Sequence, residues 1–378
     1  MKKKTFSDIL GDISEAGMAR MRRKVPEWAD TPGIEFPTRL ATEQCSSSAT
    51  AGYKAALVRR ISPGCRLLAD LTGGLGVDCA AFSGVSGRVL YNEMDPDLAA
   101  AAERNFARLG IGNVSFSCVE VTPETLPGLV SDGPDVIFLD PARRSGSGRK
   151  VFLLEDCSPD VLRLKAGLLA AAPDVLVKLS PMADLTMLRE RLGAPLRQIH
   201  IVELDGEVKE LLCLLSGSGE ASPAVPEIVL ASLRKDACEI LRFHPDEEWE
   251  TEAVYASELH PGELLLEPCA ALLKAGAFRL PCKRWSLRKL APSTHLYTGA
   301  RTPWFKAWRI REILPFGTAS FKRLKQSCPR AEITARNLPL GSEALRKKMG
   351  ISPGGDAHIF ACRLSDGSAV LLVCGREA

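Results

Sequence analysis

Short apolar runs alternate with stretches of helical periodicity over residues 65–216. The strand-like runs cover residues 66–70, 88–93, 114–119, 135–140, 175–179 and 198–203. Helical patterns between them include 97–109, which is rich in alanine, and 158–172. Strands that alternate with helices indicate βαβ units, in which a mostly parallel sheet is covered on both faces. We therefore expect an α/β fold over this part of the chain.

Two further pairs of runs predict hairpins. The dipeptide Asp205-Gly206 precedes an apolar run at 210–215, which predicts a hairpin into a final antiparallel strand. Near the end of the chain, Ser365-Asp366-Gly367 separates the runs 358–363 and 369–374. We expect a terminal hairpin there.

The most informative turn follows the first strand-like run. Asp70 ends that run, and Thr72, Gly73, Gly74 and Gly76 follow it before a helical pattern starts. Glycines let a backbone adopt positive φ and approach a ligand closely. The spacing is not that of a dinucleotide fingerprint, because Cys79 stands where its third glycine would fall. A tight turn without a ligand is the alternative interpretation of this segment alone.

Acidic residues follow four successive strand-like runs: Asp70, Glu93, Glu120 and Asp140. In open α/β sheets, ligands bind along the edge where the strands end. Four acids at that edge favour a ligand that presents hydroxyls, an amine or another cation rather than several phosphates.

These segments resemble the class I S-adenosylmethionine (SAM)-dependent methyltransferases. Residues 69–78 match the first motif of that family, 91–96 its ribose-binding acid and 138–144 its fourth motif. The resemblance implies a Rossmann-like, seven-stranded sheet and SAM as the cofactor. It also implies a cofactor-binding role for eight residues: Asp70, Thr72, Gly73, Gly74, Gly76, Glu93, Met94 and Glu120.

The resemblance extends to the bacterial methyltransferases that carry a C-terminal THUMP-like domain. The similar segments are 43–47, 51–55, 178–182, 209–212, 267–268, 273–278, 295–298 and 336–339, so the likeness covers nearly the whole chain. One departure is Val208, which stands where the family pattern has cysteine.

The fourth motif carries the predicted chemistry of transfer. Enzymes that methylate exocyclic amines have an acid or Asn, two prolines and an aromatic residue; here the run is Asp140-Pro141-Ala142-Arg143-Arg144. We expect Asp140 and Pro141 beside the methyl-accepting atom, with Arg143 and Arg144 orienting the substrate, since guanidinium groups stack on bases and grip phosphates. Alternatively, Asp140 caps a turn and the arginines are surface charge. Lys178 ends the next strand and either touches substrate or forms an ion pair.

The net charge of +3 is an average over unlike segments. Residues 61–270 carry 18 basic and 33 acidic residues, whereas residues 271–330 carry 14 basic and one acidic residue. That second segment also holds eight aromatic residues, and basic residues among aromatic ones suit a nucleic-acid surface. Alternatively, the aromatics form a core and the charges its solvated face. Because THUMP domains occur in RNA-modifying enzymes, the resemblance favours RNA as partner.

The cysteines and the N-terminus indicate a compartment. The twelve cysteines form no C-x-x-C pair and no metal-ligand spacing with histidine, so we expect neither a metal site nor a disulfide framework. No apolar segment of signal-peptide or membrane-span type occurs. A reduced, cytoplasmic protein is the expectation.

The Gly-, Ser- and Pro-rich segment 216–226 is the best linker, and it sets the expected domains. These are an N-terminal helical segment (1–60), a methyltransferase domain (61–216), a ferredoxin-like α+β module (225–300) and a THUMP-like domain (301–378). The expected activity is methylation of a nucleotide in structured RNA, tRNA or rRNA. Alternatives are a methyltransferase acting on protein or a small molecule, and an RNA-binding protein that has lost catalysis; the glycine spacing disfavours a dehydrogenase.

Overall fold

The computed structural model describes residues 17–143, 154–217, 225–234 and 237–377. The chain divides into two compact units, Met1–Phe243 and His244–Ala378, which are described separately. No helix in the described ranges is long and apolar enough to cross a membrane.

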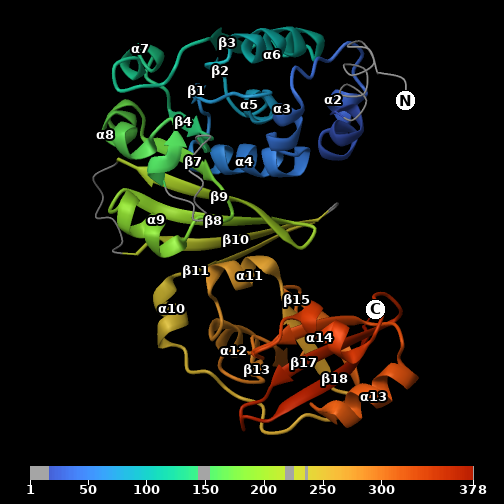
Figure 1. The fold of residues 1–378 in the computed structure, drawn as a ribbon. Coiled ribbons are helices and arrows are strands. Elements are labelled where there is room, and N and C mark those ends of the chain that lie inside the picture. Colours follow the sequence, from blue (N-terminus) through green and yellow to red (C-terminus); the bar gives the residue numbers. More distant parts are fainter. Residues whose placement is uncertain (1–16, 144–153, 218–224, 235–236, 378) are drawn as a thin grey trace, which may run out of the picture. The chain divides into compact units, whose positions relative to one another are not determined.

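The first unit is built on one nine-stranded sheet (Figure 1), in the order β11-β10-β8-β9-β7-β4-β1-β2-β3. The strands are β1 (Leu67–Asp70), β2 (Arg88–Asn92), β3 (Val114–Ser117), β4 (Val136–Leu139), β7 (Asp174–Leu179), β8 (Leu196–Leu204), β9 (Glu207–Ser216), β10 (Glu227–Arg234) and β11 (Ala237–Phe243). Strands β3, β2, β1, β4 and β7 run parallel, and β9 is antiparallel between β7 and β8. The Rossmann-like fold and the hairpin at Asp205-Gly206, where both residues have positive φ, are confirmed.

The sheet has nine strands rather than the expected seven, and the first unit continues well past residue 216. The segment after 216 leads back to the same sheet, where β10 pairs in parallel with β8 and β11 pairs antiparallel with β10. The buried strand β10 covers the outer edge of β8, whose backbone groups would otherwise lack partners. A linker composition therefore marks a crossover here, not a boundary between domains.

Helices surround this sheet. They are residues 17–24, α2 (Pro26–Ala29), α3 (Arg39–Gln44), α4 (Ser48–Ile61), α5 (Val77–Ser83), α6 (Pro96–Arg108), α7 (Leu126–Leu129), α8 (Val161–Ala171) and α9 (Leu185–Leu192). The short strands β5 (Ala142–Arg143) and β6 (Cys157–Ser158) pair with each other, and a 3-10 turn, η1, spans Leu154–Asp156.

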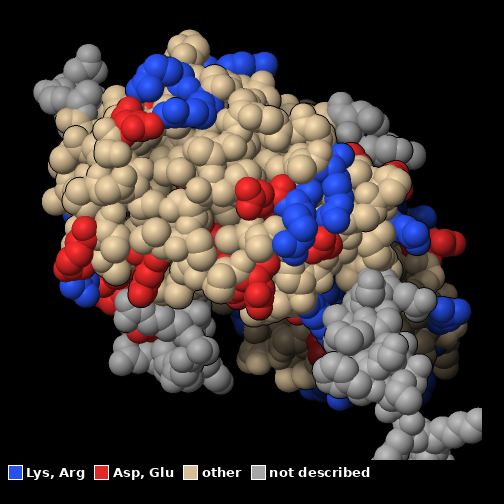
Figure 2. Space-filling model, turned by 90° about the horizontal axis from the view of Figure 1, so that it is seen from above, with Lys and Arg blue, Asp and Glu red and all other residues tan. Residues whose placement is uncertain are grey.

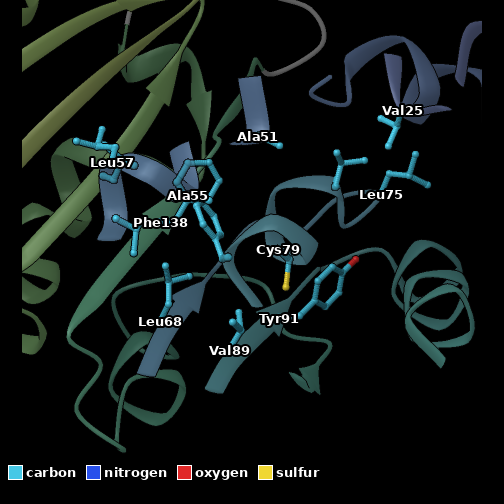
Figure 3. Close-up of a cluster of buried hydrophobic side chains, with 14 of the residues drawn as sticks. Val25, Ala51, Ala55, Leu57, Leu68, Leu75, Cys79, Val89, Tyr91 and Phe138 are labelled. Carbon is cyan, nitrogen blue, oxygen red and sulfur yellow. The ribbon is translucent and has the colours of Figure 1, made fainter. Parts of the chain in front are cut away.

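The described part of the N-terminal segment shares its core with the sheet. Ala51 and Ala55 of α4 belong to the same buried hydrophobic cluster as Leu68 and Phe138 of the strands, part of which is drawn in Figure 3. Burial of this apolar surface is the main force that holds helices onto a sheet. Helix α4 is therefore part of the methyltransferase domain rather than an appendage before it.

The second unit holds a seven-stranded sheet in the order β13-β14-β12-β15-β18-β17-β16. The strands are β12 (Leu264–Pro268), β13 (Arg288–Lys289), β14 (Tyr297–Thr298), β15 (Phe305–Pro315), β16 (Glu332–Arg336), β17 (Ala357–Arg363) and β18 (Ala369–Arg376). The helices are α10 (Pro245–Glu250), α11 (Ala270–Ala275), α12 (Leu280–Trp285), α13 (Thr318–Ser327) and α14 (Ser342–Met349). Strands β17 and β18 form the expected terminal hairpin.

The turn between β1 and α5 depends on glycine for reasons of packing. A Cβ atom on Gly73 would lie 2.1 Å from the ring of Tyr91 on β2, and the Tyr91 hydroxyl donates a hydrogen bond to the Gly74 carbonyl at 2.5 Å. Gly76 has φ +93°, and a Cβ there would lie 2.5 Å from the Phe106 ring. The backbone of this turn therefore rests on aromatic side chains of the domain core.

This geometry predicts opposite effects of two alanine substitutions. Gly73→Ala should destabilise the protein by about 1–3 kcal/mol because Tyr91 must move. Gly52 lies on an exposed face of α4, and a Cβ atom added there would meet nothing within 4 Å. Gly52→Ala should therefore stabilise the protein by about 0.5–1 kcal/mol. Urea unfolding of both variants measures this, and equal effects would contradict the role of Tyr91.

Candidate functional site

A cavity of about 760 Å³ lies where β1, β2, β4 and β7 end. Its wall includes ten residues predicted to act in the site: Asp70, Thr72, Gly73, Gly74, Gly76, Glu93, Met94, Glu120, Asp140 and Pro141. The backbone of Arg143 belongs to β5, and Arg144 lies outside the described residues. The structure thus brings the acidic strand ends to one place, as the parallel topology requires.

Asp70 lies on this wall with its carboxylate incompletely satisfied. One oxygen accepts a hydrogen bond from the Thr72 N–H at 3.2 Å, and the other has no partner among the described residues. The side chain is fully buried. Burial, together with the nearby charges of Asp78, Asp140 and Glu93, raises the pKa of Asp70 well above its usual range. A buried acceptor without a partner is costly unless a ligand supplies a donor or a positive charge.

Glu93 connects the glycine turn to the end of β2. Its two carboxylate oxygens accept hydrogen bonds from the N–H groups of Gly74, at 2.9 Å, and Asp95, at 3.0 Å. The buried Asn92 donates to the carbonyls of Leu71 and Val119 at 3.1 and 2.9 Å. These bonds fix the loops that follow β1, β2 and β3 relative to one another. Glu93 keeps lone pairs that can accept hydrogen bonds from ligand hydroxyls.

The first and fourth motifs are joined directly. The Asp140 N–H donates to the Thr72 hydroxyl at 2.6 Å. The Asp140 carboxylate accepts a hydrogen bond from the Lys178 ammonium at 2.5 Å, and Lys178 is only 12% exposed. Burial alone would lower the pKa of Lys178, but the carboxylates of Asp140, Asp78 and Glu210 outweigh it and raise that pKa. The lysine is therefore an ammonium, and this structure favours the ion pair over the substrate contact considered for Lys178.

Beside the cavity lies a buried array of charges. Lys54 on α4 is fully buried, and its ammonium lies 2.6 Å from a Glu210 oxygen and 3.2 Å from an Asp78 oxygen. The Ser46 hydroxyl donates to Asp78 at 2.7 Å. Burial raises the pKa of Glu210, although Lys54 and Lys178 act against it. Charged groups at this depth require such partners.

Several of these residues were not predicted as part of the site. Lys54, Asp78, Glu210 and Asn92 stand in helices or strands, where a single polar residue has no distinguishing spacing. One indication was present in the sequence. A lysine on an alanine-rich helix and a glutamate inside an apolar strand are both expected to be buried, and each then needs a partner of opposite charge.

The segment before α4 also forms part of the cavity wall, through Leu40, Ala41, Gln44, Cys45 and Ser46. The Lys24 ammonium holds it by donating to the carbonyls of Thr42, Glu43 and Cys45, at 3.2, 2.5 and 2.8 Å. Burial raises the pKa of the Cys45 thiol, which disfavours a nucleophilic role.

The basic segment 271–330 differs from expectation in its aromatic residues. Tyr297, Trp304, Phe305 and Phe321 are buried, so they build the core of the second unit and offer no face to a base. The exposed residues are mainly basic, for example Lys283, Arg288, Lys306, Arg311 and Lys322. These four aromatics are therefore core, as in the alternative interpretation, whereas the other four, Phe278, Trp285, Trp308 and Phe316, are only half-buried. Figure 2 shows the whole molecule from above the view of Figure 1, and on that face the visible Lys and Arg side chains lie in small groups, most of them beside acidic ones.

A parallel sheet with β9 inserted antiparallel, and a cavity lined by acids at the strand ends, define a Rossmann-like domain of the methyltransferase type. A THUMP domain-like family model matches residues 305–376, and a ferredoxin-like domain model matches residues 265–304.

An uncharacterized SAM-dependent methyltransferase of Mycobacterium tuberculosis H37Rv is 28% identical over 368 residues, 96% of this chain and 95% of its own. The crystal structure of a protein from Porphyromonas gingivalis W83, named there as a candidate methyltransferase, is 33% identical. It superposes with a TM-score of 0.86 and covers 97% of this chain and 90% of its own. The chain belongs to this family of SAM-dependent methyltransferases with ferredoxin-like and THUMP-like C-terminal domains.

The cavity fits the cofactor of this family. SAM carries a sulfonium, an ammonium and a ribose diol but no phosphate. The wall offers the orphaned oxygen of Asp70 to a donor or cation, and the accessible carboxylate of Glu120. The acids along this edge would repel a ligand that carries several phosphates.

The orphaned oxygen predicts a variant that gains stability and loses affinity. Because folding raises the pKa of Asp70, its protonated form stabilises the fold at low pH, and this stability is lost as the pH rises toward the raised pKa. Asp70→Asn removes that loss. The ligand-free variant should melt higher than the wild type at about pH 7, and it should bind SAM roughly tenfold or more weakly. Thermal unfolding against pH and calorimetry with SAM measure both, and a variant with unchanged affinity would contradict the assignment.

The buried array predicts a large, reversible loss of stability. Lys54→Met leaves the carboxylates of Glu210 and Asp78 without their nearest ammonium and should cost about 3–5 kcal/mol. Adding Glu210→Gln should recover part of the loss, because the two sites are coupled. Arg59→Met, at an exposed position of the same helix, is the control. Urea unfolding measures the free energy of unfolding of each variant. A loss for Lys54→Met no larger than that for the control would contradict the role given to the buried array.

Proposed function

We propose that this protein transfers the methyl group of SAM to a nucleotide of structured RNA, tRNA or rRNA. The observation that carries the proposal is Asp140, an acid held at the sheet edge by Lys178, in the wall of the same cavity as Asp70 and Glu93. The alternatives are a protein or small-molecule substrate, or a fold that has lost catalysis.

Residues of the first three strand ends would hold the cofactor. The glycine turn supplies a closely approachable backbone, Glu93 and Glu120 accept hydrogen bonds from hydroxyl and amine donors, and Asp70 faces positive charge. Thr72 and Met94 complete this part of the wall. When bound, SAM supplies an electrophilic methyl group on its sulfonium.

Asp140 would position the acceptor. Its carboxylate, which accepts a hydrogen bond from the Lys178 ammonium at 2.5 Å, would also accept one from the N–H of an exocyclic amine and so orient the nitrogen lone pair. Methyl transfer to nitrogen depends chiefly on such alignment. Pro141 follows on the same wall, and Arg143 and Arg144 remain predicted contacts to the substrate.

Three exposed apolar side chains belong to the wall of the cavity: Leu40, Met94 and Met182, which are 58%, 58% and 73% exposed. They come from α3 and from the loops that follow β2 and β7. Large apolar side chains left in water around a concave site favour the binding of a flat, partly apolar group. A nucleobase has this character.

Two features favour RNA over other acceptors. The THUMP domain-like match covers 305–376, and the surplus of exposed Lys and Arg in the second unit suits a polyanion. Because the buried aromatics cannot stack on bases, the main role of most of the basic segment 271–330 would be to contact phosphates.

The proposal predicts that methyl label enters RNA and depends on Asp140. The protein is incubated with labelled SAM and, separately, with total tRNA, rRNA or cell protein. Asp140→Ala should slow transfer to RNA by roughly 10²-fold or more, while SAM binding by calorimetry stays within a few-fold of the wild type. Asp30→Ala, an exposed acid of the same unit, is the control. Label found in protein alone would overturn the RNA assignment.

A further inference from the structure

A second cavity, of about 370 Å³, lies within the second unit, and its described lining residues are not those of the first cavity. It is lined by Glu248, Trp249, Gly276, Phe278, Arg279, Lys289 and Pro292. These residues come from α10, the ends of α11 and α12, and the segment from β13. The volume is within the ~300–1,000 Å³ usual for sites that hold small molecules.

Lys289 gives this cavity a buried positive group. The side chain is 3% exposed, and its ammonium donates a hydrogen bond to the Pro292 carbonyl at 3.0 Å. The ammonium also lies 5.8 Å from the Phe278 ring centroid and 6.0 Å from that of Tyr297. An ammonium has three protons to donate, and one carbonyl takes one of them. The cavity therefore offers donors to an anion.

The cavity wall holds one acid, Glu248, against two cations, Arg279 and Lys289. The Glu248 carboxylate accepts hydrogen bonds from the backbone N–H groups of Arg279, at 2.9 and 2.8 Å, and Leu280, at 2.7 Å. It thus fixes the backbone at the start of α12, and the exposed side chain of Arg279 belongs to the cavity wall.

Trp249 supplies an aromatic surface to the same cavity. It is 54% exposed, in contrast to the buried rings of the sheet in this unit. Phe278, also on this wall, is held by His295, whose ring stacks on it with the ring centroids 3.8 Å apart and an interplanar angle of 25°. An exposed tryptophan ring leaves apolar surface in water, and a base stacked on the ring removes that surface from water.

We infer that this cavity binds one unstacked nucleotide of an RNA strand, with the base on Trp249 and its phosphate on Arg279 and Lys289. Aromatic stacking combined with paired cations is the recognition used for single-stranded nucleic acid. The inference rests on the proposed function in taking RNA as the source of the nucleotide. It also gives a role to segments 273–278 and 295–298, which have no place in the methyl-transfer site.

The test titrates the full chain with adenosine 5′-monophosphate by calorimetry, so it does not require methyl transfer. Trp249→Ala and Arg279→Gln should each weaken binding by roughly tenfold, and ribose 5-phosphate should bind more weakly than the nucleotide. The matched controls are Tyr255→Ala and Arg288→Gln, which change an exposed aromatic and an exposed arginine outside the cavity wall. Circular dichroism melts establish that each variant is folded.

The outcomes separate this inference from the proposed function. No binding of the nucleotide, equal losses in the controls, or equal binding of ribose 5-phosphate would each overturn the nucleotide site. If the cavity binds the nucleotide while labelled methyl enters protein alone, the nucleotide site is supported and RNA as the substrate is overturned. If the Trp249→Ala and Arg279→Gln variants methylate RNA with an unchanged KM, RNA as the substrate is supported and the nucleotide site is overturned.

Discussion

The ion pair between Lys178 and Asp140 is the interaction on which the methyltransferase site depends. It joins the ends of β4 and β7 at 2.5 Å, and the same ammonium is influenced by Asp78 and Glu210. Those acids in turn surround Lys54 of α4. Alternating charges thus run from a helix near the N-terminus to the proposed acceptor position, inside a domain where an unpaired charge would be severely destabilising. Such an array fixes the orientation of Asp140 before any substrate arrives, which is the condition for fast transfer by alignment.

The sequence predicted the elements well where local pattern determines them. The strands that end near Asp70, Glu93, Glu120 and Asp140 form as expected, because alternating apolar runs and helices allow few topologies. Their acids meet at one edge because parallel strands end on the same side of a sheet. The likeness to methyltransferases predicts SAM as the cofactor, and the match to SAM-dependent methyltransferases confirms it.

The features that the sequence could not predict are contacts between residues far apart in the chain. The buried array pairs residues 54 and 210, which no spacing rule relates. The segment 216–226 has linker composition, yet β10 continues the sheet, since edge pairing is decided in three dimensions. Aromatic residues of the second unit could equally have faced solvent or core, and only packing distinguishes Tyr297, which is buried, from Trp249, which is exposed.

The contact between Gly73 and Tyr91 has a consequence for how this family can change over time. The tyrosine ring fills the space that any side chain at position 73 would need, and its hydroxyl supports the next residue of the turn. A larger residue at 73 is acceptable only after the ring at 91 has become smaller, and that change would first remove the support of the turn. The two positions are therefore expected to vary as a pair across relatives, with the intermediate step selected against.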